Sequence, residues 1–186
     1  MAVSATLVSA AEYLRLEREA KTKHEWYGGQ IYEMPGVGKE RGRIQMSLYF
    51  LVERILRNSN CEFFSSDIRV RAGEFYTYPH GSLVCDARFE EAELDVLLNP
   101  VALFEVLSPS TEGYDRGEKF RRYSTIETLQ EYVLISTERP RVEVFTRVVN
   151  GWLLRSYDGL DAVASLQSVP LELPLDALYQ RVFLPS

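Results

Sequence analysis

The chain has 186 residues, of which 46% are hydrophobic and 26% charged, and this balance excludes an unfolded chain and predicts a single domain over residues 1–186. The formal net charge of −6 excludes attraction to nucleic acid by overall charge, so any such binding needs a local basic patch. The sequence shows neither a signal peptide nor an uncharged run near the roughly 18 residues of a membrane helix, so we expect a cytoplasmic protein that does not enter membranes.

The N-terminal part of the chain predicts a helix followed by a hairpin. Ser9 and Glu12 have the spacing of a capping box, which predicts a short helix ending near Lys21. Residues 24–34 predict two strands joined by a turn at Gly28-Gly29. This unit precedes the segments that predict the core.

A second helix is predicted after a glycine-rich loop at residues 35–43. The loop carries three cations but lacks the pattern of a phosphate-binding loop. After it, apolar residues recur at helical spacing and predict a helix with one buried face, ending near Arg57. These apolar residues are Ile44, Leu48, Leu51, Val52 and Ile55.

Strand patterns dominate the middle of the chain. Residues 61–72 and 76–85 are rich in aromatic and β-branched side chains, and each run predicts a strand. Residues 87–97 are acidic and predict an excursion at the surface. The apolar run at residues 101–107 predicts a central strand that is covered on both faces.

The last core elements are a helix and a strand. Residues 115–123 predict a cationic helix, with Ser110 or Thr111 as its N-cap. Residues 131–136 predict a second apolar strand, and a further hairpin is predicted around Asn150-Gly151.

The two cysteines, Cys61 and Cys85, each stand at the end of a strand-like run. They do not form the CxxC spacing of a metal site. A cysteine pair of this kind suits a reducing cytosol, so we predict free thiols.

The predicted core order is helix, strand, strand, strand, helix, strand, which is an α/β class of mixed α+β type. A helix between the strands at residues 101–107 and 131–136 permits a right-handed crossover and a parallel strand pair. The hairpins imply antiparallel neighbours. We therefore predict a mixed central sheet flanked by helices, with an additional N-terminal helix and hairpin and a C-terminal hairpin.

Glu105 interrupts the apolar run of the predicted central strand and shares a face with Leu103 and Leu107. An isolated carboxylate at such a position costs several kcal/mol unless it is paired or binds a ligand. Glu105 therefore has either a buried ion-pair partner, such as Lys119 or an arginine, or a functional role. Asp115 and Lys119 have the i, i+4 spacing of a common surface pair on a helix.

The segments around this strand resemble a known family. The passage YTYPHGSLVC, the stretch EVLSPST and the Asp and Lys that follow it are similar to the Uma-two family, which is labelled "putative restriction endonuclease". This family looks like a branch of the PD-(D/E)XK nuclease superfamily, and the resemblance extends over about residues 24–179. It implies a restriction-endonuclease-like core of the order αβββαβ, which agrees with the order predicted from the residues.

The resemblance implies a metal-dependent nuclease that hydrolyses phosphodiester bonds with Mg²⁺ or Mn²⁺. Glu105 matches the (D/E) position and is expected to bind the metal. Leu107 occupies the usual lysine position, and Lys119 is the expected replacement that activates water or stabilises charge. Glu25 resembles a further catalytic acid of the family, and its alternative is a surface position on a strand.

The sequence departs from the family where the PD aspartate is expected, because His80 follows Pro79. His80 is either an altered metal ligand or a histidine that is packed in the core or faces solvent. As a ligand it would weaken Mg²⁺ binding more than Mn²⁺ binding, since Mg²⁺ prefers hard oxygen ligands. Arg41 also stands where relatives carry histidine.

Basic residues on both sides of the expected site are candidates for binding nucleic acid, and DNA is the expected form. They are Lys39, Arg41, Arg43, Arg116, Arg121 and Arg122. The alternative is that they form solvated faces. Superfamily analogy also suggests a homodimer. Two other functions stay open: a catalytically inactive nuclease fold that binds nucleic acid or a protein, and a purely structural domain.

Overall fold

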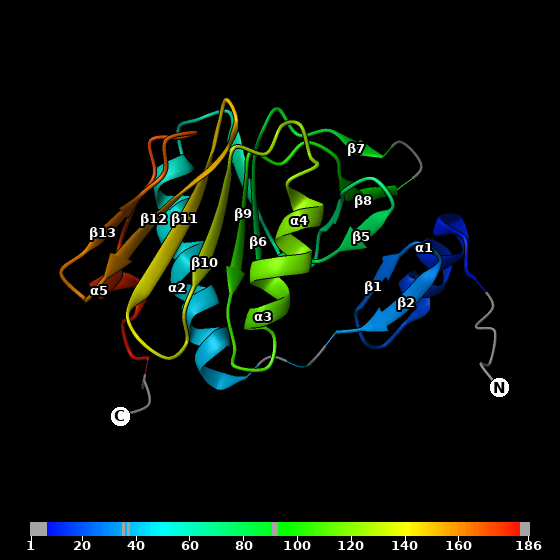
Figure 1. Ribbon diagram of the computed structural model, residues 1–186, viewed down its shortest axis with the longest axis horizontal. Helices are drawn as coiled ribbons and strands as arrows, with labels where there is room; N and C mark the ends of the chain where they lie inside the picture. Colours follow the sequence, from blue (N-terminus) through cyan, green and yellow to red (C-terminus); the bar gives the residue numbers. More distant parts are fainter. Residues whose placement is uncertain (1–6, 35, 37, 91–92, 183–186) are drawn as a thin grey trace.

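The computed structural model describes residues 7–34, 36, 38–90 and 93–182, which form two six-stranded sheets, a two-stranded sheet and the helices packed on them (Figure 1). The predicted class, a mixture of helices and strands with a mixed central sheet, is confirmed. Within the described residues, no helix combines the length and apolar character that a membrane crossing requires.

The core sheet has the order β12-β11-β10-β9-β6-β3. Its strands are β3 (Cys61–Ser65), β6 (Gly81–Cys85), β9 (Ala102–Val106), β10 (Glu131–Ile135), β11 (Arg141–Val148) and β12 (Gly151–Asp158). β9 and β10 are parallel, whereas every other neighbouring pair is antiparallel. All residues of β9 and β10 are buried, so the predicted central strand is confirmed.

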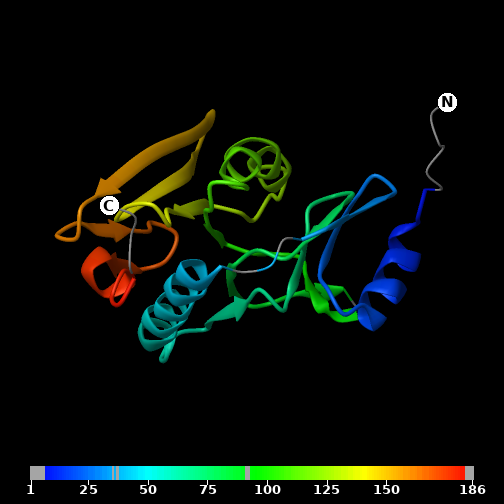
Figure 2. The same cartoon turned by 90° about the horizontal axis from the view of Figure 1, so that it is seen from below.

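Helices cover both faces of the core sheet, as Figure 2 shows. One face carries α2 (Lys39–Leu56) and α5 (Leu175–Leu178), which pack with β9, β10 and the small sheet of β13 (Val163–Ser165) and β14 (Glu172–Pro174). The crossover between β9 and β10 lies on the other face and runs through α3 (Glu112–Tyr114), a π-helical segment η1 (Asp115–Lys119) and α4 (Phe120–Tyr123). The apolar stripe of α2 is buried except at Ile55, which is 38% exposed, so that prediction was wrong for one residue.

A second sheet, which we call the N-terminal sheet, has the order β2-β1-β5-β4-β8-β7. Its strands are β1 (His24–Tyr27), β2 (Gln30–Glu33), β4 (Arg69–Arg71), β5 (Phe75–Thr77), β7 (Phe89–Glu90) and β8 (Glu93–Leu97). The helix α1 (Ala10–Glu19) packs beside it through Tyr13 and Trp26, at the end of the molecule away from β11 and β12 (Figure 1).

The existence of two sheets corrects the prediction that residues 61–72 and 76–85 each form one strand. The first run breaks at a turn in which the N–H of Ile68 donates to the carbonyl of Ser65. The second breaks at Pro79, which has no N–H for a ladder. Each run therefore contributes one strand to each sheet.

The acidic segment at residues 87–97 was predicted as a surface excursion, and that prediction was wrong at its end. Val96 and Leu97 on β8 are fully buried. Positions 91 and 92 lie outside the described residues, as do positions 35 and 37 of the predicted glycine-rich loop.

Several local signals formed the predicted structures. Ser9 Oγ accepts the N–H of Glu12 at the start of α1, as the capping spacing predicts. Gly28 and Gly29 have positive φ angles in the β1–β2 turn, where a residue with a Cβ would be strained. The helix of the crossover begins three residues earlier than predicted, with Thr111 at its N-cap, although the Thr111 side chain makes no capping bond.

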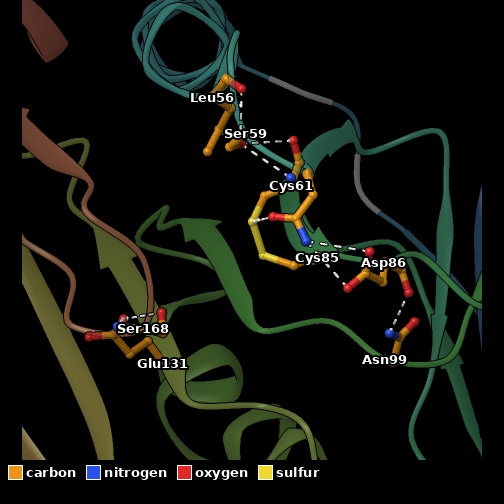
Figure 3. Close-up of a disulfide and its surroundings, with 9 residues drawn as sticks. Leu56, Ser59, Cys61, Cys85, Asp86, Asn99, Glu131 and Ser168 are labelled. Atoms are coloured by element: carbon orange, nitrogen blue, oxygen red, sulfur yellow. Dashed lines mark hydrogen bonds between the residues drawn. A yellow bond between two sulfur atoms is a disulfide. The ribbon is translucent and has the colours of Figure 1, made fainter.

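Cys61 and Cys85 form a disulfide, which overturns the prediction of free thiols (Figure 3). β3 and β6 are antiparallel and place the two residues directly opposite each other, with Cα atoms 3.9 Å apart. Sequence spacing does not reveal this register, because the two residues are 24 positions apart. The number and spacing of the cysteines therefore do not indicate a reducing compartment.

Candidate active site

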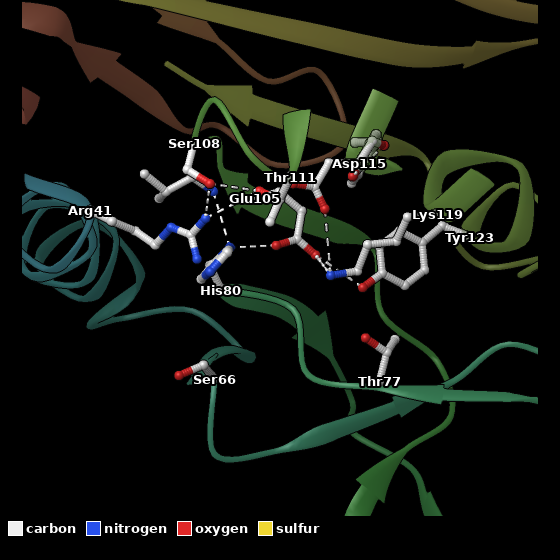
Figure 4. A network of polar contacts seen from close by, with 12 residues as sticks. Arg41, Ser66, Thr77, His80, Glu105, Ser108, Thr111, Asp115, Lys119 and Tyr123 are labelled. Atoms are coloured by element: carbon white, nitrogen blue, oxygen red, sulfur yellow. Dashed lines mark hydrogen bonds and ion pairs between the residues drawn. The ribbon is translucent and has the colours of Figure 1, made fainter. Parts of the chain in front are cut away.

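The predicted site residues gather where the crossover helix, the core sheet and the N-terminal sheet meet. A cleft of about 610 Å³ opens there, and its wall includes Glu25, His80, Asp115 and Lys119. Glu105 is fully buried next to these residues and contacts both His80 and Lys119 (Figure 4). The structure therefore brings together all four of the residues that the sequence predicts for catalysis or metal binding.

The Lys119 ammonium lies among three carboxylates. Its Nζ atom is 2.8 Å from Glu105, 3.3 Å from Glu25 and 3.7 Å from Asp115. The π-helical turn η1 carries both Asp115 and Lys119, and each is only 3% exposed. The expectation of a surface pair was therefore wrong, because the side of η1 that carries both residues faces the sheet. Local π-helical turns of this kind are frequent at functional sites.

Charge around Lys119 fixes the protonation of its neighbours. Burial alone would lower the pKa of Lys119, but the three carboxylates outweigh it and raise that pKa well above the ordinary value. Burial would likewise raise the pKa of Glu105, but the charge of Lys119 and the contact with His80 lower it to about 2. Both groups are therefore charged at neutral pH. Three acids around one ammonium leave an excess of negative charge.

His80 follows the break at Pro79 and lies directly before β6. Its Nδ1 atom accepts the backbone N–H of Val106 at 3.1 Å and also lies against Oε2 of Glu105. One nitrogen cannot accept from Val106 and donate to Glu105 at the same time. Where Nδ1 accepts from Val106, Glu105 Oε2 is a buried oxygen without a hydrogen bond.

Glu25 is buried, not a surface residue of β1. Its Oε1 atom accepts the Thr77 hydroxyl at 2.5 Å and faces Lys119, and its Oε2 atom accepts the Tyr114 hydroxyl at 2.7 Å. Both oxygens therefore have partners. This arrangement fits a residue that positions Lys119 better than an open metal ligand.

Asp115 is the acid whose charge is least favoured. Burial and the charge of Glu105 raise its pKa to about 6, against the opposing effect of Lys119. Its Oδ2 atom is buried without a hydrogen bond. At neutral pH this carboxylate is ionised at a cost to the folded state.

We expect Asp115→Asn to change how stability depends on pH. A raised pKa in the folded state contributes stability that is present below the ordinary value of 3.8 and is lost as the pH rises through about 6. The wild type should therefore lose free energy of unfolding relative to Asp115→Asn over this window. Urea unfolding in EDTA at several pH values would measure the difference, and a difference that stays constant with pH would contradict the pKa assignment.

The six predicted nucleic-acid-binding cations do not all reach the cleft. Arg41 and Arg122 line it, and Arg122 also stacks 3.6 Å above the ring of Tyr27. The others lie elsewhere: Lys39 lines a neighbouring hollow, Arg43 donates to the Arg181 carbonyl, Arg116 pairs with Glu112 and Glu143, and Arg121 pairs with Glu118.

Sequence reasoning missed two residues of the site, one in the wall of the cleft and one buried behind it. Lys23 lines it and contacts Ser66 and Asp67. Tyr123, on α4, donates to Oε1 of Glu105 at 3.1 Å. The signal for Tyr123 was its spacing, four residues after Lys119 on one helix. Lys23 gave no such signal.

Comparisons with known proteins agree with this fold. A family model described as "Uma2: Putative restriction endonuclease" matches residues 10–177. The chain belongs to the Uma2 family. The resemblance noted above under the name Uma-two is thereby confirmed.

Relatives of this Uma2 protein include two from Synechocystis sp., named "Uncharacterized protein slr1290" and "Uncharacterized protein sll1609". They are 35% and 34% identical to it, over 93% and 87% of this chain and 92% and 94% of theirs. A crystal structure titled as a putative nuclease belonging to DUF820, from Anabaena variabilis, has a TM-score of 0.78 at 19% identity and covers 95% of this chain and 99% of its own. The restriction-endonuclease-like fold is confirmed.

Proposed function

We propose that this Uma2 protein is a metal-dependent nuclease that hydrolyses phosphodiester bonds of nucleic acid, with DNA as the expected substrate. The observation that carries the proposal is the buried ammonium of Lys119 among Glu25, Glu105 and Asp115 beside a cleft. Such a cluster gives no advantage to a purely structural core, because apolar residues of similar volume would be as stable.

The residues around Lys119 suit a divalent ion whose coordination shell is completed only when substrate binds. Within the described residues, no three His, Cys, Asp or Glu side chains are placed to share one ion. Glu105 Oε2 and Asp115 Oδ2 are nevertheless buried oxygens that are open to an ion, because Oδ2 has no hydrogen bond and Oε2 has only its contact with His80, and the cluster carries excess negative charge. Mg²⁺ is typically held by one or two carboxylates, water and substrate phosphates. Glu105 and Asp115 would hold the ion, with the imidazole of His80 as the neighbouring donor.

When bound, the ion would supply Lewis-acid stabilisation of the phosphoryl oxygens and a more acidic water. Lys119 stays charged, so its role in the proposal is to stabilise negative charge at the phosphate, not to remove a proton. Asp115 would share the ion with Glu105, and the positive charge of the ion would keep its carboxylate ionised. Glu25 would keep Lys119 in place.

Digestion of single-stranded DNA, double-stranded DNA and RNA would test the proposal, with Mg²⁺, Mn²⁺ or EDTA in parallel. We expect cleavage with Mn²⁺, weaker cleavage with Mg²⁺ and none in EDTA, because an imidazole donor disfavours Mg²⁺. His80→Asp should raise the Mg²⁺-dependent rate relative to the Mn²⁺-dependent rate. Cleavage that persists in EDTA would contradict the proposal.

The second candidate function is a nuclease fold that binds nucleic acid or a protein without cutting. It is favoured by one observation, which is that Lys119 already neutralises Glu105 where a metal would bind. Nucleic-acid binding without cleavage, for the wild type and His80→Asp alike, would support it. The homodimer stays a prediction, which light scattering would test.

A further inference from the structure

Arg41 is a buried cation with no ion pair among the described residues. It is 6% exposed, and its Nη2 atom donates to Ser108 Oγ at 2.6 Å and to Thr111 Oγ1 at 3.1 Å (Figure 4). Its Nε atom is buried without a hydrogen bond. A guanidinium is always charged, so partners that are only hydroxyl groups leave its charge uncompensated.

The position of Arg41 is also unusual. It lines the cleft and a second hollow of about 380 Å³, and this hollow lies in front of the first turn of α2. Gly38 is the N-cap there and offers no side-chain cap, and a Cβ added at Gly38 would meet nothing within 4 Å. The dipole of a helix favours an anion at its N-terminus. Lys39 and Ser110 lie on the same wall.

We propose that Arg41 binds a backbone phosphate of the nucleic-acid strand next to the phosphate that is cut. The strand would extend from the cleft past Arg41 into the hollow at the start of α2. The inference depends on the proposed function only in placing the cut beside Lys119 and Glu105. The substrate feature that Arg41 would recognise is a flanking phosphodiester and not a base.

Ser108 and Thr111 hold the guanidinium in one orientation before the strand arrives. Both residues come from the loop between β9 and the crossover helix, so the strand that carries Glu105 also leads to the residues that hold Arg41. Holding the side chain in advance reduces the entropy lost on binding. Phosphate binding by a fixed guanidinium is then stronger than binding by a mobile surface cation.

The competing explanation is that Arg41 only ties the start of α2 to this loop. A structural tie predicts that replacement of Arg41 lowers stability and weakens all ligands equally. A phosphate contact predicts an effect that depends on the charge of one particular linkage. The experiment must therefore vary the substrate charge and Arg41 together.

The test is a series of single-stranded thymidine oligonucleotides, no longer than the cleft and the hollow together can hold so that the strand cannot shift its register, in which each phosphodiester in turn is replaced by a neutral methylphosphonate. Fluorescence anisotropy in EDTA gives the dissociation constant of each for the wild type, Arg41→Gln and Arg54→Gln. Arg54 is an exposed arginine in the last turn of the same helix and controls for loss of one positive charge. Arg41→Lys, which keeps the charge, is a fallback should the Gln variant not fold.

In the wild type and Arg54→Gln, we expect one neutral linkage to weaken binding by about tenfold, as a lost charge-assisted contact does. Arg41→Gln should bind the fully charged strand about tenfold more weakly and be insensitive to that linkage, while the other linkages keep their effects. With Arg41→Lys the effect of that linkage should shrink, because the guanidinium geometry is lost.

An identical pattern in Arg41→Gln and the wild type would overturn the inference, as would a failure of every strand to bind. Cleavage of the same strands with Mn²⁺ is measured separately. Absence of cleavage together with an Arg41-dependent linkage would contradict the proposed nuclease activity and support the phosphate contact. The two failures are therefore distinguishable.

Discussion

Glu105→Gln should lower the rate of metal-dependent cleavage by on the order of 10²–10³-fold, the size of effect seen when a key electrostatic contact is removed from an active site. Glutamine keeps the shape of the side chain but removes the negative charge that a divalent ion would need. Lys119 retains Glu25 and Asp115 as partners, so the variant should fold. Initial rates with Mn²⁺ on the best DNA substrate would measure the loss.

Glu143→Gln is the matched control for this experiment. Like Glu105, Glu143 is a buried glutamate of the core sheet. Its partner is an arginine, Arg116, and it does not line the cleft. We expect its cleavage rate to stay close to that of the wild type. Equal cleavage by Glu105→Gln and the wild type would remove Glu105 from the proposed chemistry and point to a contaminating nuclease.

Lys119→Met should reduce the free energy of unfolding by about 3–5 kcal/mol near neutral pH, the usual cost of removing one partner from a buried ionic group. Methionine fills a similar volume, but it leaves Glu25, Glu105 and Asp115 without their shared ammonium. Their pKa values in the folded state should then rise, so the loss should be largest at high pH and shrink as the pH falls. Urea unfolding in EDTA at several pH values would measure this loss of free energy of unfolding.

Two further variants make this prediction specific. Lys21→Met, at an exposed position, should change stability by no more than about 0.5 kcal/mol. The double variant Lys119→Met with Asp115→Asn should recover part of the loss, because one buried negative charge is removed with the ammonium. A loss for Lys119→Met that does not vary with pH, and that Asp115→Asn does not reduce, would show that packing and not charge stabilises this site.

The central part of the site could be predicted because single residues there carry strong signals. A carboxylate in a run of buried apolar residues has few explanations, so Glu105 was identified on β9 from the sequence alone. The crossover helix between two apolar strands followed from their order, and it placed Lys119 near the same strand. Turn chemistry at Gly28-Gly29 likewise gave the hairpin that carries Glu25.

The rest depends on relations that a linear pattern does not contain. Asp115 and Lys119 have the spacing of a surface pair, and only the packing of η1 shows that both are buried. Cys61 and Cys85 pair because of a strand register. Arg41 has the sequence context of a solvated cation, and its burial depends on hydroxyl groups located 67 and 70 residues away. Tertiary contacts decide each of these cases.

The shared partner of Glu25 and Glu105 has a mechanical consequence. Glu25 belongs to the N-terminal sheet and Glu105 to the core sheet, so Lys119 links the two sheets through one pair of contacts. Any rotation that widens the space between the sheets must lengthen at least one of these contacts and leave a carboxylate uncompensated. Entry of a cation at that moment would offset the loss. Opening of the molecule and capture of positive charge are therefore expected to occur together.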